Sequence, residues 1–215
     1  MSPGPVAGNM KAGSKREEAK RRAGESAADL ASDGDLVGLG TGSTAAHAIR
    51  ALGRRIDAGL DVQGVATSYQ ARERAREAGV PLAALDAVEA LDLAIDGADQ
   101  VADDGAALVK GGGAAHAREK VVDAAAERFV VVVDPTEPAD ALDHPVPVEV
   151  LPDARATVAR RVRETGGEPT LRRAERKDGP VVTDNGNLVL DCDFGAVPDP
   201  GALAATLAAV PGVVE

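Results

Sequence analysis

Short apolar runs alternate with segments of helical periodicity over the first two thirds of the chain. The run FVVVVD at residues 129–134 is β-branched on both faces, which is typical of a strand buried in a parallel sheet. This alternation with short connections predicts an α/β domain with a doubly wound parallel sheet. The strands are expected at 36–39, 62–66, 81–85, 91–96, 107–110 and 129–134, and the helices at 14–31, 45–52, 68–78 and 114–128.

The pattern changes after residue 134, where prolines become frequent. The stretch TDNGN at 183–187 lies between two apolar runs and is typical of a hairpin turn. Beyond the prolines we expect a small α+β domain of the split βαβ, ferredoxin-like kind. Its strands are expected at 146–150, 170–174, 181–182 and 188–190, and its helices at 154–165 and 200–209.

The chain has 215 residues, which is enough for one main domain with a sizeable core and a small appendage. We expect a Rossmann-like domain at 14–143 and the small α+β domain at 144–215. Residues 1–13 are rich in glycine, proline and serine, and we expect them to form a disordered extension. The length is too small for two full nucleotide-binding domains.

The chain is acidic, with a formal net charge of −11 from 35 Asp and Glu and 24 Lys and Arg. Such a surface repels nucleic acid and acidic membranes, and it favours solubility at high salt, which indicates a salt-adapted organism. Any phosphate-bearing ligand must therefore be held by a local positive site. No apolar run reaches membrane-spanning length, and no apolar core follows the early basic residues, so a cytoplasmic protein is expected.

One cysteine, Cys192, excludes an internal disulfide framework and is expected to pack inside a strand. The sequence has no cluster of cysteine and histidine, so we expect no zinc-type metal site. The candidate chemistry therefore rests on carboxylates, lysines, hydroxyls and backbone amides.

The stretch from 93 to 120 contains most of that chemistry. One apolar run ends at the turn DGAD at 96–99, and a second ends at Lys110, which three glycines at 111–113 follow. Ligands of open α/β sheets bind beyond the carboxyl ends of the strands, so these groups predict a site. The next helix carries Glu119, a candidate base. The alternative is ordinary turn chemistry, with Glu119 a solvated residue of a helix that packs through another face.

A second glycine turn, GTGST at 40–44, joins a predicted strand to the start of a helix. Free backbone N–H groups and the positive helix end attract anions there, and the hydroxyls of Thr41, Ser43 and Thr44 add donors. The turn lacks the lysine and spacing of a P-loop and does not match GxGxxG, which favours a small phosphorylated or carboxylated ligand over a nucleotide. The alternative is a simple helix N-cap by Ser43 or Thr44.

Five segments together carry a family resemblance. They are GLGTGSTAAH at 38–47, DGAD at 96–99, KGGGAAHAREK at 110–120, PVPVEVLP at 145–152 and VVTDNGNLVLD at 181–191. In this order and spacing the chain resembles ribose-5-phosphate isomerases of the A type, from about residue 15 to its end. The resemblance implies an aldose-ketose isomerase of the non-oxidative pentose phosphate pathway. Such an enzyme interconverts D-ribose 5-phosphate and D-ribulose 5-phosphate through an enediol(ate), without metal or organic cofactor, as a homodimer or homotetramer.

The resemblance also implies roles for individual residues. Glu119 matches the family's general base, while Lys110, with Asp96 and Asp99, would polarise the sugar oxygens and transfer protons. Asp96 and Lys110 are also a reasonable acid/base pair for opening the sugar ring. The residues expected to contact the substrate are Lys20, Thr41, Gly42, Ser43, Thr44, Asp96, Gly97, Ala98, Asp99, Lys110, Gly111, Gly112 and Gly113.

Two features depart from the family pattern. Glu137 stands where the family commonly has a lysine, and a carboxylate opposes a phosphate dianion. We therefore leave Glu137 out of the site and expect Lys20 and the backbone of 42–44 to carry more of the phosphate contact. The chain also ends at Glu215, where relatives continue into two strand segments that return to the main sheet.

Three other functions occur on related scaffolds. A coenzyme A transferase would use a glutamate such as Glu119 as its nucleophile. An amino-sugar-phosphate isomerase/deaminase is a second enzyme of a related scaffold. A non-catalytic sugar-phosphate sensor usually carries a DNA-binding appendage, for which the chain has neither room nor basic charge. We therefore favour the isomerase.

Overall fold

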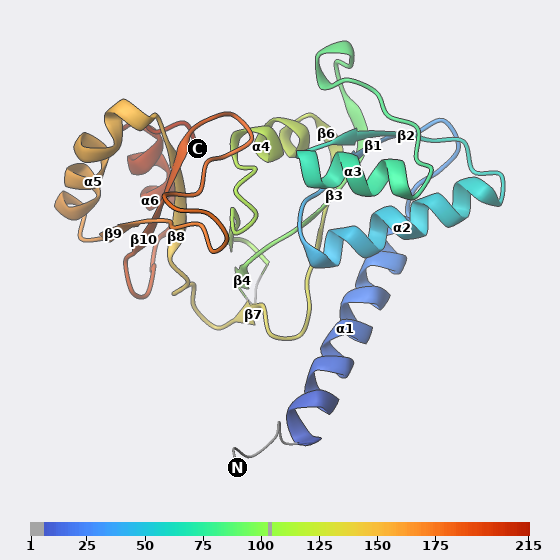
Figure 1. Ribbon diagram of the computed structural model, residues 1–215, viewed down its shortest axis with the longest axis horizontal. Coiled ribbons are helices and arrows are strands. Elements are labelled where there is room, and N and C mark those ends of the chain that lie inside the picture. The colour runs from blue at the N-terminus through green and yellow to red at the C-terminus, as the bar shows by residue number, and fades with distance from the viewer. Residues whose placement is uncertain (1–6, 103–104) are drawn as a thin grey trace.

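Four parallel strands form the sheet at the centre of the larger part of the molecule (Figure 1). The computed structural model describes residues 7–102 and 105–215. The chain passes from β1 to β2 on one side and then crosses to the other side of β1 for β3, which creates a topological switch point between β1 and β3. The strand order is β2 (Gln63–Ala66), β1 (Leu36–Leu39), β3 (Leu91–Gly97) and β6 (Ala126–Val132).

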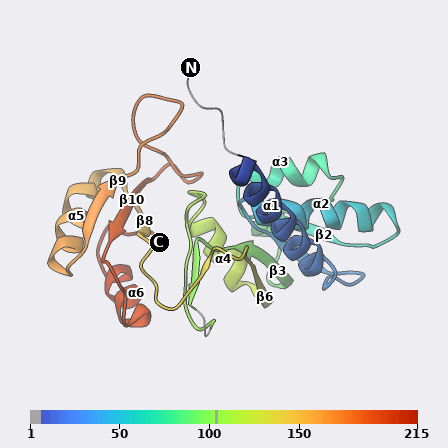
Figure 2. The same ribbon diagram turned by 90° about the horizontal axis from the view of Figure 1, so that it is seen from below.

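Helices cover both faces of this sheet (Figure 2), and the predicted doubly wound α/β fold is confirmed. On one face, Ile49 and Leu52 pack against β1 and β3 in a continuous apolar core. On the other face, α4 (Ala117–Ala124) packs Val122 against the sheet. The helices of the first face are α1 (Ala7–Ala28), α2 (Ser43–Asp57) and α3 (Tyr69–Glu77).

Gly38 in β1 allows α4 to lie close to the sheet. A Cβ atom at this position would lie 2.6 Å from Cγ1 of Val122 and 2.9 Å from Cβ of Ala94. Because α4 also carries Glu119, the absent side chain at Gly38 helps to set the distance between that carboxylate and the strand ends.

The strand predicted at 107–110 does not join the main sheet and belongs instead to a small second sheet. Its strand order is β5 (Leu108–Val109), β4 (Gln100–Ala102) and β7 (Pro138–Ala139), so the predicted strand at 107–110 is wrong in its sheet assignment. The chain turns back after β3, and the backbone N–H of Asp99 donates to the carbonyl of Val109 at 2.8 Å. This reversal brings Lys110 back to the end of β3.

Several element boundaries differ from the predictions. The expected strand at 81–85 is reduced to one bridge between Gly64 and Leu82, followed by a 3-10 turn (Leu85–Ala87). The helix expected at 114–128 begins only at Ala117, because Ala114 and His116 have positive φ angles of 57° and 38°. β6 begins earlier than expected because Ala126 already pairs with Leu91 of β3.

The N-terminal helix α1 begins at Ala7, so the expected disordered extension 1–13 is wrong for residues 7–13. No proline follows Pro5 in this segment, and an interior glycine costs a helix only about 1 kcal/mol relative to alanine. Residues 1–6 lie outside the described part of the chain.

The smaller part is a three-stranded antiparallel sheet in the order β8, β10, β9, with the helices α5 and α6. Cys192 is buried in its core as expected. Val213 forms a bridge to Val150 on the free side of β8, which gives the strand arrangement of a split βαβ unit. The elements are β8 (Val146–Val150), a 3-10 turn (Pro152–Ala154), α5 (Arg155–Glu164), β9 (Glu168–Leu171), β10 (Leu188–Asp193) and α6 (Pro200–Ala208).

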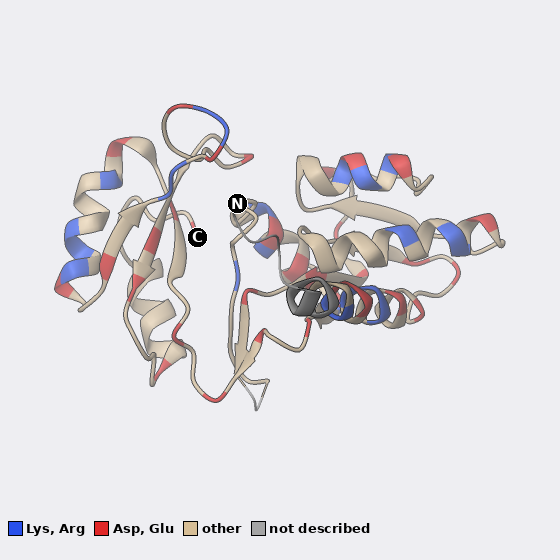
Figure 3. Ribbon diagram, turned by 60° about the horizontal axis from the view of Figure 1, so that its bottom comes forward, with Lys and Arg blue, Asp and Glu red and all other residues tan. Residues whose placement is uncertain are grey.

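Lys and Arg residues lie mainly along the helices (Figure 3). Many of the acidic residues lie in the loops and turns, and others form intrahelical pairs, such as Glu25 with Arg21. Within the described residues, no helix is long and apolar enough to cross a membrane.

Candidate active site

The loops that follow β1 and β3 meet at the switch point of the sheet and form a cleft of about 280 Å³. All the predicted substrate-contacting residues line it except Lys20 and Asp96. Asp96 lies beneath the cleft with no solvent exposure, and Lys20 reaches its edge from α1. The lining residues are Thr41, Gly42, Ser43, Thr44, Gly97, Ala98, Asp99, Lys110, Gly111, Gly112, Gly113, Glu119, Val132 and Glu137.

The start of α2 forms one end of the cleft. The N-cap residue is Gly42, at a φ of 114° that favours glycine, so neither Ser43 nor Thr44 caps the helix. Among the described residues, no group accepts from the backbone N–H groups of Ser43 and Thr44, which leaves these donors for an anion. The Nζ of Lys20 donates to Oγ of Ser43 at 2.8 Å and adds a positive charge beside the loop.

Asp96 joins the loops at the centre of the site. Its Oδ1 accepts from the backbone N–H of Thr41 at 3.0 Å and of Gly97 at 2.7 Å. Its Oδ2 accepts from Nζ of Lys110 at 2.7 Å. Gly40 makes room for this carboxylate, because a Cβ atom there would lie 2.2 Å from Oδ1. Three hydrogen-bonding groups, one from each of three loops, are thus fixed around one buried acid.

Lys110 lies between three carboxylates. Besides Asp96, its Nζ donates to the carbonyl of Gly97 at 2.8 Å and lies 4.0 Å from both Oε1 of Glu119 and Oδ2 of Asp123. Burial alone would lower the pKa of Lys110, but the charges of the carboxylates outweigh it and raise the pKa above its usual value. The ammonium therefore stays protonated, with one N–H not used by any described residue.

Asp99 holds the triple-glycine turn. Its Oδ2 accepts from the backbone N–H of Gly112 at 2.8 Å, and a Cβ atom at Gly112 would lie 2.3 Å from Oδ1 of Asp99. The two acids of the DGAD turn therefore have different neighbours: Asp96 contacts Lys110, and Asp99 contacts the glycine loop.

Glu119 is only 4% exposed, so its interpretation as a solvated helix residue is wrong. Burial and then the charge of Asp96 raise the pKa of Glu119 to about 8, against the opposing effect of Lys110. A carboxylate with such a pKa is a stronger base than an exposed one and titrates near neutral pH. The cleft therefore combines a carboxylate suited to proton transfer with an ammonium and a helix start whose N–H groups are free to bind an anion.

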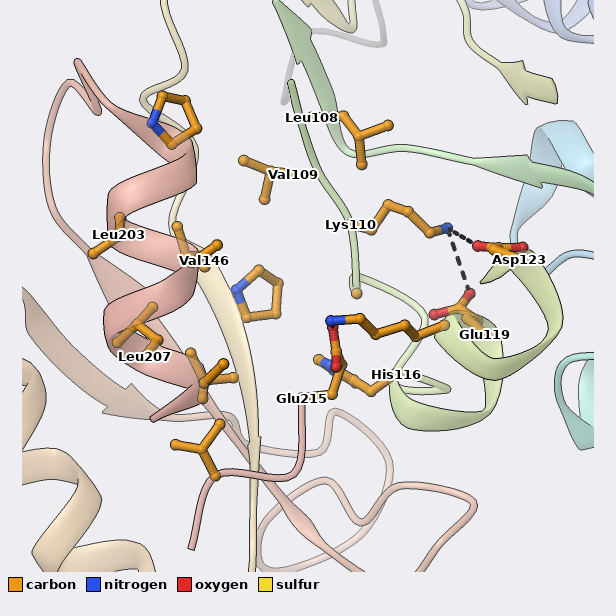
Figure 4. A pocket seen from close by; sticks show the side chains of 18 of the residues that line it. Leu108, Val109, Lys110, His116, Glu119, Asp123, Val146, Leu203, Leu207 and Glu215 are labelled. Carbon is orange, nitrogen blue, oxygen red and sulfur yellow. Dashed lines mark hydrogen bonds and ion pairs between the residues drawn. The ribbon is translucent and has the colours of Figure 1, made fainter. Parts of the chain in front are cut away.

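A second cavity of about 530 Å³ adjoins the cleft between α4 and the smaller part (Figure 4). Apolar side chains of β8 and α6, such as Val146, Leu203 and Leu207, form much of its wall. Lys110 and Glu119 line both spaces. Within the described residues, no group of three or more His, Cys, Asp or Glu residues could hold a metal ion.

Residues 63–215 match the model of the family described as ribose 5-phosphate isomerase A (phosphoriboisomerase A). The chain belongs to this isomerase family. It is 68% identical over 199 residues to ribose-5-phosphate isomerase A of Haloarcula marismortui, covering 93% of this chain and 86% of the relative. The corresponding enzyme of Halorubrum lacusprofundi is 62% identical over 216 residues, covering 96% and 90%. These halophile relatives agree with the acidic composition.

Solved structures of the isomerase family share the fold over nearly the whole chain. Ribose 5-phosphate isomerase A of Methanocaldococcus jannaschii has a TM-score of 0.89 and 44% identity, covering 93% of this chain and 89% of that one. A D-ribose-5-phosphate isomerase in complex with phospho-erythronic acid has a TM-score of 0.89 and 41% identity, covering 93% and 88%. The isomerase family is therefore favoured over the transferase, deaminase and sensor alternatives.

Sequence reasoning missed Arg172, which supports the glycine loop of the candidate site from the smaller part. Its Nη1 donates to the carbonyls of Gly111 at 2.9 Å and Gly112 at 3.2 Å, while its Nε donates to Asp191 at 2.9 Å. The carboxylate orients the guanidinium, and the guanidinium fixes the glycine loop. Nothing in the local pattern around Arg172 indicates this contact with a loop about 60 residues earlier.

Glu149, also missed, ties the start of α4 to the TDNGN hairpin. It is fully buried; its Oε2 accepts from the backbone N–H of Ala117 at 3.0 Å, and its Oε1 accepts from Thr183 at 2.6 Å and Asn187 at 3.0 Å. Burial acts to raise the pKa of Glu149, but these hydrogen bonds outweigh it and lower the pKa overall. The sequence gives one indication of a structural role for Glu149, which is its position as a charged residue inside the apolar run PVPVEVLP.

Glu149→Ala should lower the free energy of unfolding by about 3 kcal/mol or more, because several buried donors lose a charged acceptor at once. Urea denaturation followed by circular dichroism measures this loss. Asp153→Ala removes an exposed carboxylate of the same part of the chain and should change the stability by less than about 0.5 kcal/mol. Equal stability of the two variants would contradict the structural role of Glu149.

Proposed function

We propose that this chain interconverts D-ribose 5-phosphate and D-ribulose 5-phosphate by proton transfer through an enediol(ate), without metal or organic cofactor. The observation that carries the proposal is the buried carboxylate of Glu119, 4.0 Å from the ammonium of Lys110, in a cleft whose other end is an anion-binding helix start. A base, a cation and a phosphate site at the two ends of one small cleft match the needs of a phosphorylated sugar.

Glu119 takes the proton from C2 of the open-chain aldose in the first step. The electron pair of the C2–H bond forms the C1–C2 double bond, and the carbonyl at C1 becomes an oxyanion. The ammonium of Lys110 and the backbone amides of 111–113 stabilise this charge. Glu119 then returns the proton to C1, while a proton passes from O2 to O1 and leaves the ketone at C2. The reaction is balanced and needs no redox partner.

Ring opening precedes this transfer for the cyclic sugar. The acid/base pair that we propose for it is Asp96 and Lys110, whose side chains are in direct contact at 2.7 Å. Asp99 positions the glycine loop that lies against the sugar oxygens. These roles place acid/base work on the charged side of the cleft, away from the phosphate end.

The phosphate end combines Lys20 with the amides of 42–44. Glu137 also lines this end, and its Oε2 accepts from the backbone N–H of Asp134 at 2.7 Å. Burial raises the pKa of Glu137. We propose that Lys20 and the helix start carry the phosphate contact.

Ser43→Ala and Thr44→Ala should each raise the KM for ribose 5-phosphate about tenfold with little change in kcat, because a hydroxyl contact to a charged group is lost at an unreacting end. Steady-state kinetics measure both constants. Ser32→Ala, at an exposed serine outside the cleft, is the matched control and should leave both unchanged. A loss confined to kcat would mean that the phosphate does not bind at this loop.

The test of the proposed function is turnover of ribose 5-phosphate by the purified chain, with phospho-erythronic acid as a competitor. A D-ribose-5-phosphate isomerase 41% identical to this chain was solved with that compound, which supports its use as a probe. A thioester-exchange assay with acetyl-coenzyme A runs in parallel. We expect isomerisation, competitive inhibition and no exchange. Exchange without isomerisation would favour the transferase, and binding without turnover would favour the sensor.

We further propose that the protein acts in the cytoplasm as a homodimer or homotetramer and binds sugar phosphate rather than nucleic acid or membranes. The net charge of −11 supports the choice of partner. Apolar side chains at the surface, including Val121 at 53% exposure and Phe129 at 39%, support association between copies. Sedimentation equilibrium distinguishes a monomer from the proposed assemblies.

A further inference from the structure

Asp123 lies one helical turn after Glu119 on α4 and faces the same ammonium. Its Oδ2 is 4.0 Å from Nζ of Lys110, the distance that also separates Nζ from Oε1 of Glu119. The side chain is 11% exposed. Figure 4 shows the carboxylates of Asp123 and Glu119 both directed at Lys110.

The surroundings of Asp123 differ from those of a structural acid. Its Oδ1 is buried and has no hydrogen-bond partner within the described residues. Glu149, which is structural, accepts hydrogen bonds from four groups. An unsatisfied buried carboxylate oxygen costs stability, so its presence beside the proposed base requires another explanation.

We propose that Asp123 is a positioning residue for the isomerisation, whose negative charge competes with Glu119 for Lys110 and thereby keeps Glu119 a strong base. The inference rests on the proposed role of Glu119. It concerns how the base is tuned and does not change which residue removes the proton.

The charged groups that face Asp123 come from several elements. Asp96 extends from β3, Lys110 follows β5, and Glu119 shares α4. Three other titratable groups line the same cavity: His116, Lys120 and Glu215. Lys120 and Glu215 pair with each other at 2.8 Å, and burial lowers the pKa of His116 to about 4, so that this ring is neutral. The single ammonium of Lys110 therefore faces three carboxylates, those of Asp96, Glu119 and Asp123.

Charge balance gives the direction of the effect. Burial, and then the charge of Asp96, raise the pKa of Asp123 to about 7, close to that of Glu119 at about 8. The charge of Asp123 is one of the causes of the raised pKa of Glu119, after burial and the charge of Asp96. A more basic Glu119 removes the C2 proton with a greater driving force once it is ionised.

Asp123→Asn removes this charge with almost no change of shape. The acid limb of the pH profile of kcat/KM, which reports the free enzyme, should move to lower pH by up to roughly one unit. The ionisation of the substrate phosphate is common to both proteins and does not affect the comparison.

Three variants complete the experiment. Asp123→Glu retains the charge and should retain the acid limb near its original position. Glu127→Gln removes an exposed carboxylate just beyond α4 and should leave the limb unmoved. Asp123→Ala also removes the charge, so the acid limb of its pH profile should shift as that of Asp123→Asn does. A folded sample of either variant is enough to test the proposal. Thermal melts establish which variants are folded.

An unmoved limb in a folded Asp123→Asn or Asp123→Ala protein would overturn the inference. That result leaves the proposed function intact if Glu119→Gln is inactive. Near-normal activity of Glu119→Gln would instead overturn the proposed function itself, whatever the profile of the Asp123 variants.

Discussion

Glu119→Gln should lower the turnover of ribose 5-phosphate by about a hundredfold or more, the usual scale for losing a general base, while changing KM little. The amide keeps the shape of the side chain but cannot accept the C2 proton. The carboxylate is 4% exposed, and burial is the main cause that raises its pKa to about 8. It is therefore a stronger base than an exposed carboxylate of ordinary pKa. Steady-state kinetics near pH 9, where Glu119 is ionised, give the full difference.

Binding of phospho-erythronic acid provides the control for this variant. The variant should bind the compound with an affinity close to that of the unmodified chain, because the phosphate end at 42–44 is untouched. Isothermal titration calorimetry measures this affinity. Near-normal turnover by a folded Glu119→Gln protein would remove Glu119 from its proposed role.

Lys110→Met should also lower turnover by about a hundredfold or more, the scale for one oxyanion-stabilising donor. Burial lowers the pKa of Lys110, but its carboxylate neighbours outweigh burial and raise the pKa overall, so the residue enters the isomerisation step as an ammonium. This charge stabilises an oxyanion that exists in the enediolate and not in the bound sugar, so kcat should fall more than KM rises. Arginine should restore only part of the activity, because its planar fork differs in shape from a compact ammonium.

Lys110 also ties Asp96 to the carbonyl of Gly97, so a structural contribution has to be measured separately. Activity is therefore compared at a temperature where thermal melts show both proteins to be folded. Lys120→Met makes the same substitution at a lysine that is 63% exposed and should leave turnover unchanged. If the loss of activity in Lys110→Met follows the loss of folded protein and reverses on cooling, the lysine is a structural tie only.

Much of the fold follows from local patterns. The strands at Leu36–Leu39 and Val146–Val150 have the predicted bounds, because each is an apolar run between polar or proline-containing turns. The small sheet of β4, β5 and β7 could not be predicted in the same way. Strands of two or three residues carry no measurable periodicity, and this sheet exists because the chain reverses after Asp99.

The residues of the candidate site likewise fall into those that local sequence patterns predict and those that they do not. Glycine turns and charges that follow strands are visible in the sequence, and the residues predicted from them lie in or beside one cleft. Arg172 and Glu149 are not visible, because their partners lie far away in the sequence and only the tertiary fold brings them together. Asp123 shows the remaining difficulty: its spacing from Glu119 was readable, but its burial beside Lys110 was not.

The most direct test of the central claim is isomerisation of ribose 5-phosphate in deuterated water with an excess of metal chelator. Proton transfer by Glu119 predicts full turnover in the chelator, with solvent deuterium appearing at C1 of the ribulose 5-phosphate formed. Activity that is lost in the chelator and restored by a divalent metal, with no deuterium in the product, would contradict it.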